Sequence, residues 1–334
     1  MAEQVAVDVG YGFTKAVSTA GRRCCFPSVV APVRGGGDLA ALTGGGTLRH
    51  RVDLQRSGAE ADAVLVGEAA LAAGGVRSWH QDAASRPDYA LLTLTAMALL
   101  GGEGRIDLAV GLPVAGWAQR AGRRALREQL IGLSAWVSAD GEVARYVEVG
   151  SCLVLPQALG AYVAALSADG SLARGRYGVV DVGFRTTDLV LLLPNADGVP
   201  VPDDARSGSV DAGIGLAYEA VRGQLERESG VLVDEGIVLA ALRGDGVLRV
   251  RGAARDLRVP FGKGVRSVAE RVEAAVRRLW AEQLEFLDGL LLAGGGGAAL
   301  LPALGLPGMR PVDGGIYANA EGFLRQMAVS GRMA

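Results

Sequence analysis

Two short stretches of this sequence place residues that can hold phosphate and metal directly after an apolar strand. In the first, VDVGYGFTK, an aspartate at the strand end is followed by two glycines, a threonine and a lysine (Asp8, Gly10, Gly12, Thr14 and Lys15). Turn glycines let the backbone approach an anion closely, and turn amides can point at phosphate oxygens. The carboxylate suits a hydrated magnesium ion, which prefers oxygen ligands and keeps several waters. The alternative is an ordinary hairpin with one solvated aspartate.

The lysine of this stretch is unusual for the chain. Of the 34 basic residues only two are lysine, Lys15 and Lys263, and the rest are arginine. A compact ammonium at Lys15 therefore favours a specific task there. We interpret Lys263, in PFGKG, as a lysine of a flexible loop, and the alternative is a contact with a partner or a nucleotide.

The second stretch, VVDVGFRTTD, repeats this set of residues in the other half of the chain. It offers Asp181 at a strand end, Gly183 in the turn, and hydroxyls at Thr186 and Thr187. An internal repeat of strand, turn and strand indicates two related domains. Together the two copies predict a pair of hairpins that hold a triphosphate and its metal from opposite sides.

A third stretch, LAGGGGA, predicts a buried strand, a glycine turn and a short helix, with Gly294, Gly295 and Gly296 in the turn. Such a turn lets a backbone lie flat against a nucleoside, although it is common in α/β proteins. A G-x-G-x-x-G does not follow the first strand, and no G-x-x-x-x-G-K-[ST] occurs. The sequence therefore favours neither a Rossmann fingerprint nor a P-loop.

Apolar periodicity predicts the elements that must position these stretches. We expect strands at 5–9, 15–18, 106–110, 147–155 and 177–182, and helices at 91–100 and 117–130. Pro156 is suited to start a further helix that carries 158–166. Valines at helical spacing from Val268 predict another helix late in the chain.

Composition bounds the class of protein. The chain has 334 residues, of which 50% are hydrophobic, and this suits two domains with sizeable cores. Its net charge of -2 argues against sequence-independent electrostatic binding to nucleic acid. Three cysteines make a poor disulfide framework and favour a reducing cytoplasm. The longest apolar run, 91–100, is about half of the roughly 20 residues that a membrane helix needs, so we expect a cytoplasmic protein without a membrane span.

The order of the motifs resembles the actin, sugar-kinase and chaperone ATPase superfamily, and within it the ParM/StbA actin-like ATPases. The likeness rests on DVGYGFTK, GLPVAGW, LPQALGAY, VVDVGFRTTD, DAGIG, LAGGGG and YANAEGF. It implies an actin-like bilobed α/β fold, with a central mixed sheet and flanking helices in each domain and the nucleotide in the cleft between them. Domain I would span 1–155, with a small inserted subdomain at about 34–62. Domain II would span 156–334, with a helical insertion at about 215–285.

The resemblance also implies roles for single residues. Asp8 and Asp181 would lie around the magnesium, and Gln157 would orient the attacking water, so these three form the implied catalytic group. Gly213 of DAGIG, Glu219 and Arg222 would lie by the purine and ribose, and Gly294 to Gly296 would back the adenosine. The alternatives are a helix N-terminal polar residue for Gln157 and a solvated ion pair for Glu219 and Arg222. Where many members have a second glycine in the second hairpin, this chain has Phe184.

The implied function is a polymerising ATPase. It would bind ATP or ADP with Mg²⁺, form filaments with copies of itself, and hydrolyse ATP slowly to drive plasmid DNA segregation or to position cargo. DNA would be reached through a DNA-bound adaptor protein and not directly. The alternatives are a non-polymerising small-molecule kinase and a nucleotide-dependent scaffold of the same fold, and the sequence leaves open ATP against GTP.

Overall fold

The computed structural model describes residues 3–33, 50–55, 62–78 and 86–330, and the chain divides into two compact units. Unit 1 comprises residues 1–112, 116–156 and 323–334, and unit 2 comprises 113–115 and 157–322. Most of the inserted subdomain expected at 34–62 lies outside the described residues. Its described part includes β5 (Arg51–Gln55), which joins the main sheet of unit 1.

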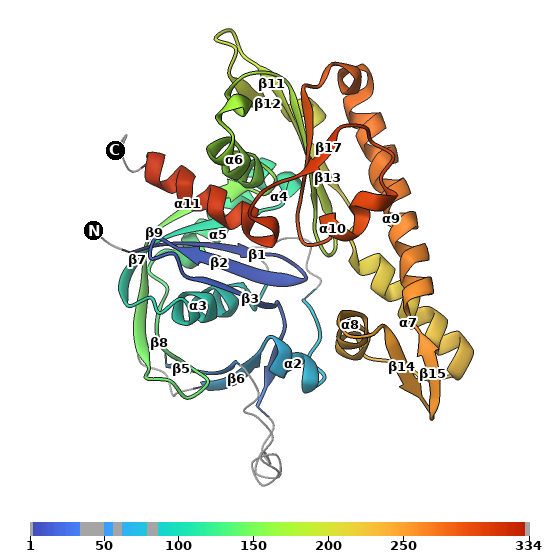
Figure 1. Ribbon diagram of the computed structural model, residues 1–334. Helices are drawn as coiled ribbons and strands as arrows, with labels where there is room; N and C mark the ends of the chain where they lie inside the picture. The colour runs from blue at the N-terminus through green and yellow to red at the C-terminus, as the bar shows by residue number, and fades with distance from the viewer. Residues whose placement is uncertain (1–2, 34–49, 56–61, 79–85, 331–334) are drawn as a thin grey trace. The chain divides into compact units, whose positions relative to one another are not determined.

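The described residues of unit 1 form a nine-stranded mixed sheet (Figure 1). Its centre is parallel where β1, β7 and β9 lie side by side, and antiparallel where β1 meets β2. The strands run in the order β3 (Arg23–Pro27), β2 (Phe13–Ser18), β1 (Glu3–Val9), β7 (Gly104–Leu112), β9 (Arg145–Pro156), β8 (Ser134–Ala139), β5, β6 (Asp62–Val66) and β4 (Val30–Pro32).

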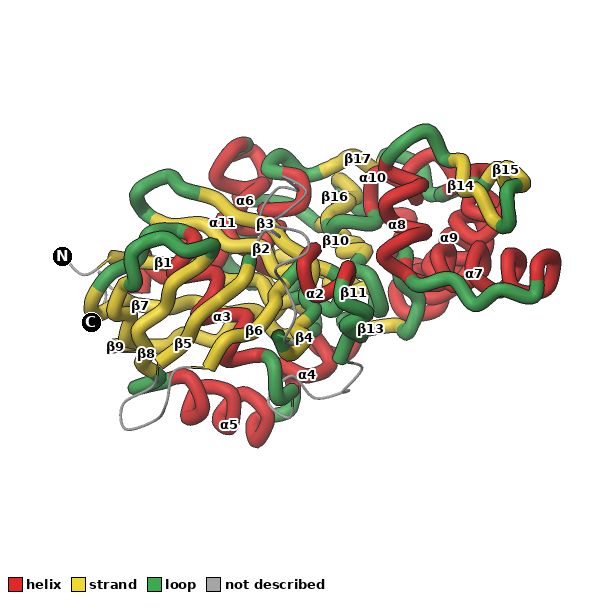
Figure 2. Tube along the Cα trace, turned by 90° about the horizontal axis from the view of Figure 1, so that it is seen from below, coloured by secondary structure: helices red, strands yellow, loops and turns green. Residues whose placement is uncertain are grey.

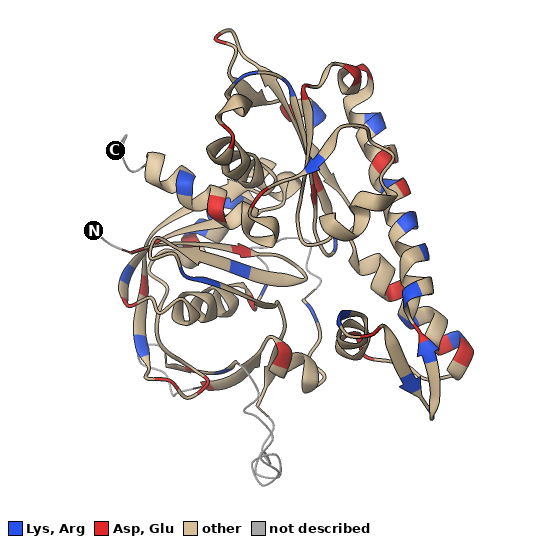
Figure 3. Ribbon diagram, in the orientation of Figure 1, with Lys and Arg blue, Asp and Glu red and all other residues tan. Residues whose placement is uncertain are grey.

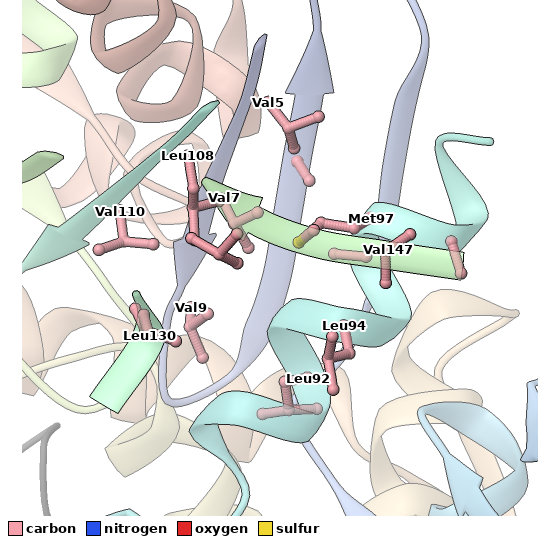
Figure 4. Packing of buried hydrophobic residues seen from close by; sticks show 14 of the residues in the cluster. Val5, Val7, Val9, Leu92, Leu94, Met97, Leu108, Val110, Leu130 and Val147 are labelled. Carbon is pink, nitrogen blue, oxygen red and sulfur yellow. The ribbon is translucent and has the colours of Figure 1, made fainter. Parts of the chain in front are cut away.

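Helix α3 (Tyr89–Leu99) lies in the concave side of this sheet, where it contacts β1, β2, β8 and β9 (Figure 1). Nine of its 11 residues are buried, as expected for a helix that is apolar on every side. Leu92, Leu94 and Met97 pack with valines of β1 and β7 (Figure 4). This core fixes the end of β1, where the first hairpin turn begins.

The predicted helix at 117–130 is two helices. Helix α4 (Val114–Ala118) ends before Gln119, whose extended backbone (ψ 103°) breaks the run, and α5 (Arg120–Leu130) follows. Helix α5 packs on β9 through Leu126 and Leu130 and exposes its arginines. Figure 2 shows it beside the strands of unit 1, and α2 (Glu68–Ala72) is a further short helix of this unit.

Unit 2 contains, in its described residues, a six-stranded sheet that is covered on both faces. Along β10, Val180 and Val182 pack with α9 (Arg258–Trp280), and Tyr177 and Val179 pack with α6 (Leu159–Ala168). Burial on both faces explains why this strand is apolar at almost every position. The strands are β12 (Pro200–Pro202), β11 (Thr187–Pro194), β10 (Tyr177–Val182), β16 (Gly289–Ala293) and β17 (Met309–Pro311) in that order, with β13 (Gly208–Val210) paired to β11.

The segment expected to be a helical insertion, 215–285, contains a hairpin as well as helices. Its elements are α7 (Gly215–Ser229), α8 (Glu235–Arg243), β14 (Val247–Val250), β15 (Ala253–Asp256) and α9. Lys263 is an exposed residue of α9, so our loop interpretation was wrong. The chain continues through α10 (Gly297–Leu300) to α11 (Ala318–Ser330).

Charge is spread over the chain. Lys and Arg are interspersed with Asp and Glu over the elements of both units in Figure 3. Among the helices described here, none combines the length and the apolarity needed to cross a bilayer.

Candidate functional site

The first hairpin joins β1 to β2 and brings a carboxylate and an ammonium group together. Asp8 and Lys15 are opposite each other in the strand register, and Lys15 Nζ lies 3.3 Å from Asp8 Oδ2. The Asp8 side chain is 4% exposed and that of Lys15 is 13% exposed. The carboxylate and the ammonium are therefore held as a largely desolvated pair at the strand end.

The turn between them is tight. The Gly10 amide donates to the carbonyl of Phe13 over 3.2 Å, and a Cβ on Gly10 would lie 3.0 Å from that oxygen. Glycine is therefore the residue that the turn tolerates at this position. The Thr14 hydroxyl, predicted to reach a phosphate, is fully buried and lies 2.9 Å from Ser28 Oγ.

Two buried arginines that sequence reasoning missed hold the backbone of this turn. Arg77 donates to the carbonyls of Tyr11 and Gly12, and Arg86 donates to that of Gly10 over 3.4 Å. Their guanidinium groups also lie over the rings of Phe13 and Tyr11, at 5.6 and 5.3 Å from the ring centroids. In a chain that uses arginine almost everywhere, no sequence signal distinguishes these two.

The second hairpin joins β10 to β11 in unit 2, and its carboxylate is also buried. Asp181 is 6% exposed, and its Oδ2 accepts hydrogen bonds from the Ala158 amide (3.2 Å) and from Asn319 Nδ2 (2.6 Å). The Thr187 hydroxyl is fully buried and donates to the carbonyl of Ala212 over 2.6 Å, whereas Thr186 is half-buried. The two predicted hydroxyls therefore lie in different environments.

Phe184 takes the place of the expected second glycine and anchors the tip of this hairpin. Its ring stacks on Tyr218 of α7, with centroids 5.8 Å apart, and its carbonyl accepts a hydrogen bond from the Gly215 amide over 2.7 Å. A Cβ on Gly213 would collide with the same carbonyl. The DAGIG segment therefore serves as a platform for the hairpin tip, which explains its glycines.

Gln157 lies in a turn and not at the start of a helix. Pro156 is the last residue of β9, and α6 begins only at Leu159, so the expectation that Pro156 starts this helix was wrong. Between them, Ala158 has φ 63°, in a region that L residues rarely adopt. Its amide is held by Asp181 and also by Asn319 Oδ1, 3.0 Å away.

The glycine turn after β16 lies against the second hairpin. The Gly296 amide donates to the carbonyl of Val182 over 2.9 Å. Gly294 has φ 85°, and a Cβ there would collide with Asp181 Oδ1, whereas one on Gly295 would meet nothing within 4 Å. The structure therefore brings together Asp181, the Gln157 turn and the glycine turn within unit 2.

Glu219 and Arg222, predicted for the nucleoside, are both on α7. Glu219 is exposed, and Arg222 Nε donates to the carbonyl of Val233 over 2.8 Å instead of forming the ion pair with Glu219 that was the alternative. Their role at the nucleoside stays a prediction.

Burial shifts the pKa values of groups around the first hairpin. Burial raises the pKa of Tyr89, an effect that the Arg86 charge partly offsets, and the Tyr89 hydroxyl donates to the carbonyl of Gly111. Burial likewise raises the pKa of Cys24 and of Cys152 to about 12. Both thiols are therefore protonated at neutral pH and are poor nucleophiles.

The donors present fit a magnesium ion that arrives with a nucleotide. Among the residues described by the structure, no cluster of three or more His, Cys, Asp or Glu could hold a metal ion by itself. Magnesium needs no such cage, because it is commonly bound by one or two carboxylates plus phosphate oxygens and waters. Asp8 and Asp181, each buried beside a glycine turn, supply that kind of ligand.

Two family models match the chain. Residues 6–160 match the model described as the N-terminal domain of actin-like proteins, and residues 179–305 match that of the archaeal actin homologue MreB-like C-terminal domain. An archaeal actin homolog of Thermoplasma acidophilum is 27% identical over 308 residues, which cover 87% of each chain.

Solved structures share the fold. A 15-stranded ParM filament from Clostridium botulinum aligns with a TM-score of 0.86 at 21% identity, over 98% of this chain and 99% of that one. An archaeal actin homolog crystallised with ADP aligns with a TM-score of 0.75 at 21% identity, over 98% and 99%. These likenesses confirm the predicted actin-like α/β fold with mixed sheets and flanking helices.

Proposed function

We propose that this chain is an actin-like protein and a polymerising ATPase, because residues 6–160 and 179–305 match models of the actin-like N-terminal domain and the archaeal actin MreB-like C-terminal domain. It binds ATP with Mg²⁺ through its two hairpins, assembles with copies of itself into filaments, and hydrolyses the bound ATP. The observation that carries this proposal is the repeated hairpin. In each unit a buried aspartate ends a strand, next to a turn whose backbone is fixed by neighbouring residues.

Each hairpin contributes different groups to the phosphates. The first supplies Lys15, a positive charge already held at the turn, and the backbone amides around Gly10 and Gly12. The second supplies the amides around Gly183 and the half-buried hydroxyl of Thr186. Bound with the nucleotide, Mg²⁺ would neutralise phosphate charge, and Asp8 and Asp181 are the carboxylates that would hold it.

Gln157 is the residue that we assign to the attacking water. The Ala158 amide in its turn donates a hydrogen bond to Asp181. The residue that orients the water and the carboxylate that would hold the metal are therefore positioned by the same local contact. A neutral amide can orient a water but is a poor base. Hydrolysis is therefore slow, and the rate depends on positioning and on charge stabilisation by the metal and the amides.

Filament formation is proposed from the likeness in fold to the Clostridium botulinum ParM filament, and nucleotide binding from the archaeal homolog crystallised with ADP. The cargo that we propose is plasmid DNA, reached through a DNA-bound adaptor protein. The interspersed charges and the net charge of -2 support an indirect contact, because direct binding needs a concentrated basic face.

Electron microscopy with phosphate-release measurements tests the proposal. With ATP and Mg²⁺ the purified protein should form filaments and release phosphate, and without nucleotide it should form none. GTP in a parallel sample decides the nucleotide preference. Formation of ADP and a phosphorylated acceptor only after addition of an acceptor alcohol, without release of free phosphate, would indicate a small-molecule kinase. Binding without turnover or filaments would indicate a scaffold.

A further inference from the structure

Asn319, in the first turn of α11, makes hydrogen bonds to two parts of the candidate site. Its side chain is buried, with 6% of the residue exposed. Its Nδ2 donates to Asp181 Oδ2 over 2.6 Å, and its Oδ1 accepts from the amides of Ala158 (3.0 Å) and Ala161 (3.1 Å). Because backbone amides can only donate, the oxygen of the side chain must face them and the NH₂ group must face the carboxylate.

Asn319 contacts both parts directly. Ala158 has φ 63° and ψ -46°, a conformation that alanine disfavours, and its amide is shared between Asn319 and Asp181. One oxygen of Asp181 lies against Gly294, and the other accepts from Asn319 and Ala158. Removal of Asn319 would take one hydrogen bond from the carboxylate and one from the turn that carries Gln157.

A close contact between two helix backbones holds Asn319 at this position. Gly322, one turn along α11, lies so close to Gly160 of α6 that a Cβ would collide with the Gly160 backbone. This close approach fixes the register of α11 against α6. The chain also uses asparagine only twice, at Asn195 and Asn319.

We propose that Asn319 is a positioning residue that sets both the orientation of the Asp181 carboxylate and the conformation of the Gln157 turn. The effect of Asn319 on catalysis rests on the proposed function, since Asp181 and Gln157 act on nucleotide only if the protein is an ATPase. Its effect on the conformation of Asp181 and the Gln157 turn does not depend on that function. Asn319 touches neither phosphate nor water in this role, and it acts through its two partners.

The variant Asn319→Asp tests whether Asn319 orients the Asp181 carboxylate or only stabilises the fold. Aspartate keeps the oxygen that accepts the amides of Ala158 and Ala161, but it sets a second carboxylate against Asp181 in place of the donor. Because like charges repel, the Asp181 carboxylate should leave the orientation that Asn319 gives it. Asp188, opposite Asp181 on β11, is the nearby acid in the strand register, and it accepts the Val114 amide.

The first experiment measures amide hydrogen exchange without nucleotide. In Asn319→Ala the Ala161 amide should lose protection because the Asn319 oxygen is removed, and the Ala158 amide should lose part of its protection because it keeps Asp181 as an acceptor. The matched control is Asn195→Ala, since Asn195 is exposed and its Oδ1 also accepts two amides, those of Asp197 and Val199. Unchanged protection in Asn319→Ala would overturn the proposal whether or not the protein is an ATPase.

The second experiment measures ATP turnover from about pH 6 to about pH 8. In Asn319→Asp, kcat should be about 10- to 100-fold lower than that of the wild type, with KM for ATP changed less. Asn195→Asp should follow the wild type throughout. A kcat for Asn319→Asp that tracks the wild type at every pH would overturn the proposal. A wild type without turnover would overturn the proposed function, and hydrogen exchange would still decide the role of Asn319.

Discussion

Lys15 Nζ lies 3.3 Å from Asp8 Oδ2, so the rare lysine of this chain is held against the carboxylate at the end of the first strand. In the proposed function Lys15 therefore has two tasks: it compensates a buried carboxylate, and it supplies charge to the phosphates of the bound nucleotide. The two tasks can be separated by measuring stability and affinity in the same variants.

Lys15→Met should reduce both quantities. Loss of the cation beside buried Asp8 should lower the free energy of unfolding by about 1–3 kcal/mol. ATP affinity should fall about 10- to 100-fold, because a charge-assisted hydrogen bond to phosphate is lost. Chemical denaturation and a fluorescent-nucleotide titration measure the two effects, and adding Asp8→Asn should restore part of the stability but none of the affinity. Lys263→Met, an exposed lysine of α9, is the control, and an equal loss of affinity there would contradict the assignment.

Arg86→Lys should loosen the first turn. Arg86 is 2% exposed in its side chain and forms a two-pronged pair with Asp88, through Nε (3.2 Å) and Nη2 (3.1 Å), while it also donates to Gly10. A lysine cannot reproduce that fork, so the free energy of unfolding should fall by about 1–3 kcal/mol. Arg124→Lys, in an exposed ion pair with Glu128, should cost less than about 0.5 kcal/mol. Equal costs in urea denaturation would show that the Arg86 fork adds nothing.

Phe184→Gly should weaken nucleotide binding although it restores the glycine pair expected at this position. The variant loses the stacking on Tyr218 and gains backbone freedom, so the tip of the second hairpin would no longer be fixed. We expect the free energy of unfolding to fall by about 2 kcal/mol, with affinity for ATP falling in parallel. Phe184→Tyr keeps the ring and is the control. Tighter binding by Phe184→Gly in calorimetry would show that glycine freedom matters more here than anchoring.

The elements that local sequence determines were predicted well. Both hairpins have the strands that alternation and turn glycines indicate, and α3 and β16 lie where their apolar runs predicted. The predictions were wrong where a contact between residues distant in the sequence determines the local conformation. Pro156 could start a helix by itself, but pairing with Leu112 keeps it in β9. The conformation of Ala158 then depends on Asp181 and Asn319, which are far away in the chain.

The same limit explains the site residues that sequence reasoning missed. Arg77 forms an isolated β-bridge with Val29, and Arg86 precedes α3. Only the folded chain shows that their side chains donate to the turn carbonyls. Asn319 was part of a quoted motif, YANAEGF, but its spacing to Asp181 is 138 residues, so no local pattern could join them.

Stability should fall at alkaline pH because of the buried thiols. Burial raises the pKa of Cys152 in the folded protein to about 12, from an ordinary value of 9.0. The unfolded chain therefore loses this proton first, so the stabilisation is complete below about pH 9 and is lost as the pH rises toward about 12. From about pH 9 to about pH 10, the wild type should lose about 1 kcal/mol more than Cys152→Ala. Parallel losses in urea denaturation would show that the thiol is not shielded.

Gln157→Ala should slow hydrolysis while leaving nucleotide binding and assembly largely intact. Asp181 and Asn319 hold the turn at the backbone amide of Ala158, and truncation of the Gln157 side chain keeps both contacts while it removes the water-orienting group. We expect phosphate release to fall about 10- to 100-fold, with filaments still formed in ATP and persisting longer. The control is Gln224→Ala, whose amide bonds to Glu228 on the exposed side of α7. Phosphate release at the wild-type rate in Gln157→Ala would remove Gln157 from the mechanism and leave water positioning to the backbone of the two hairpins.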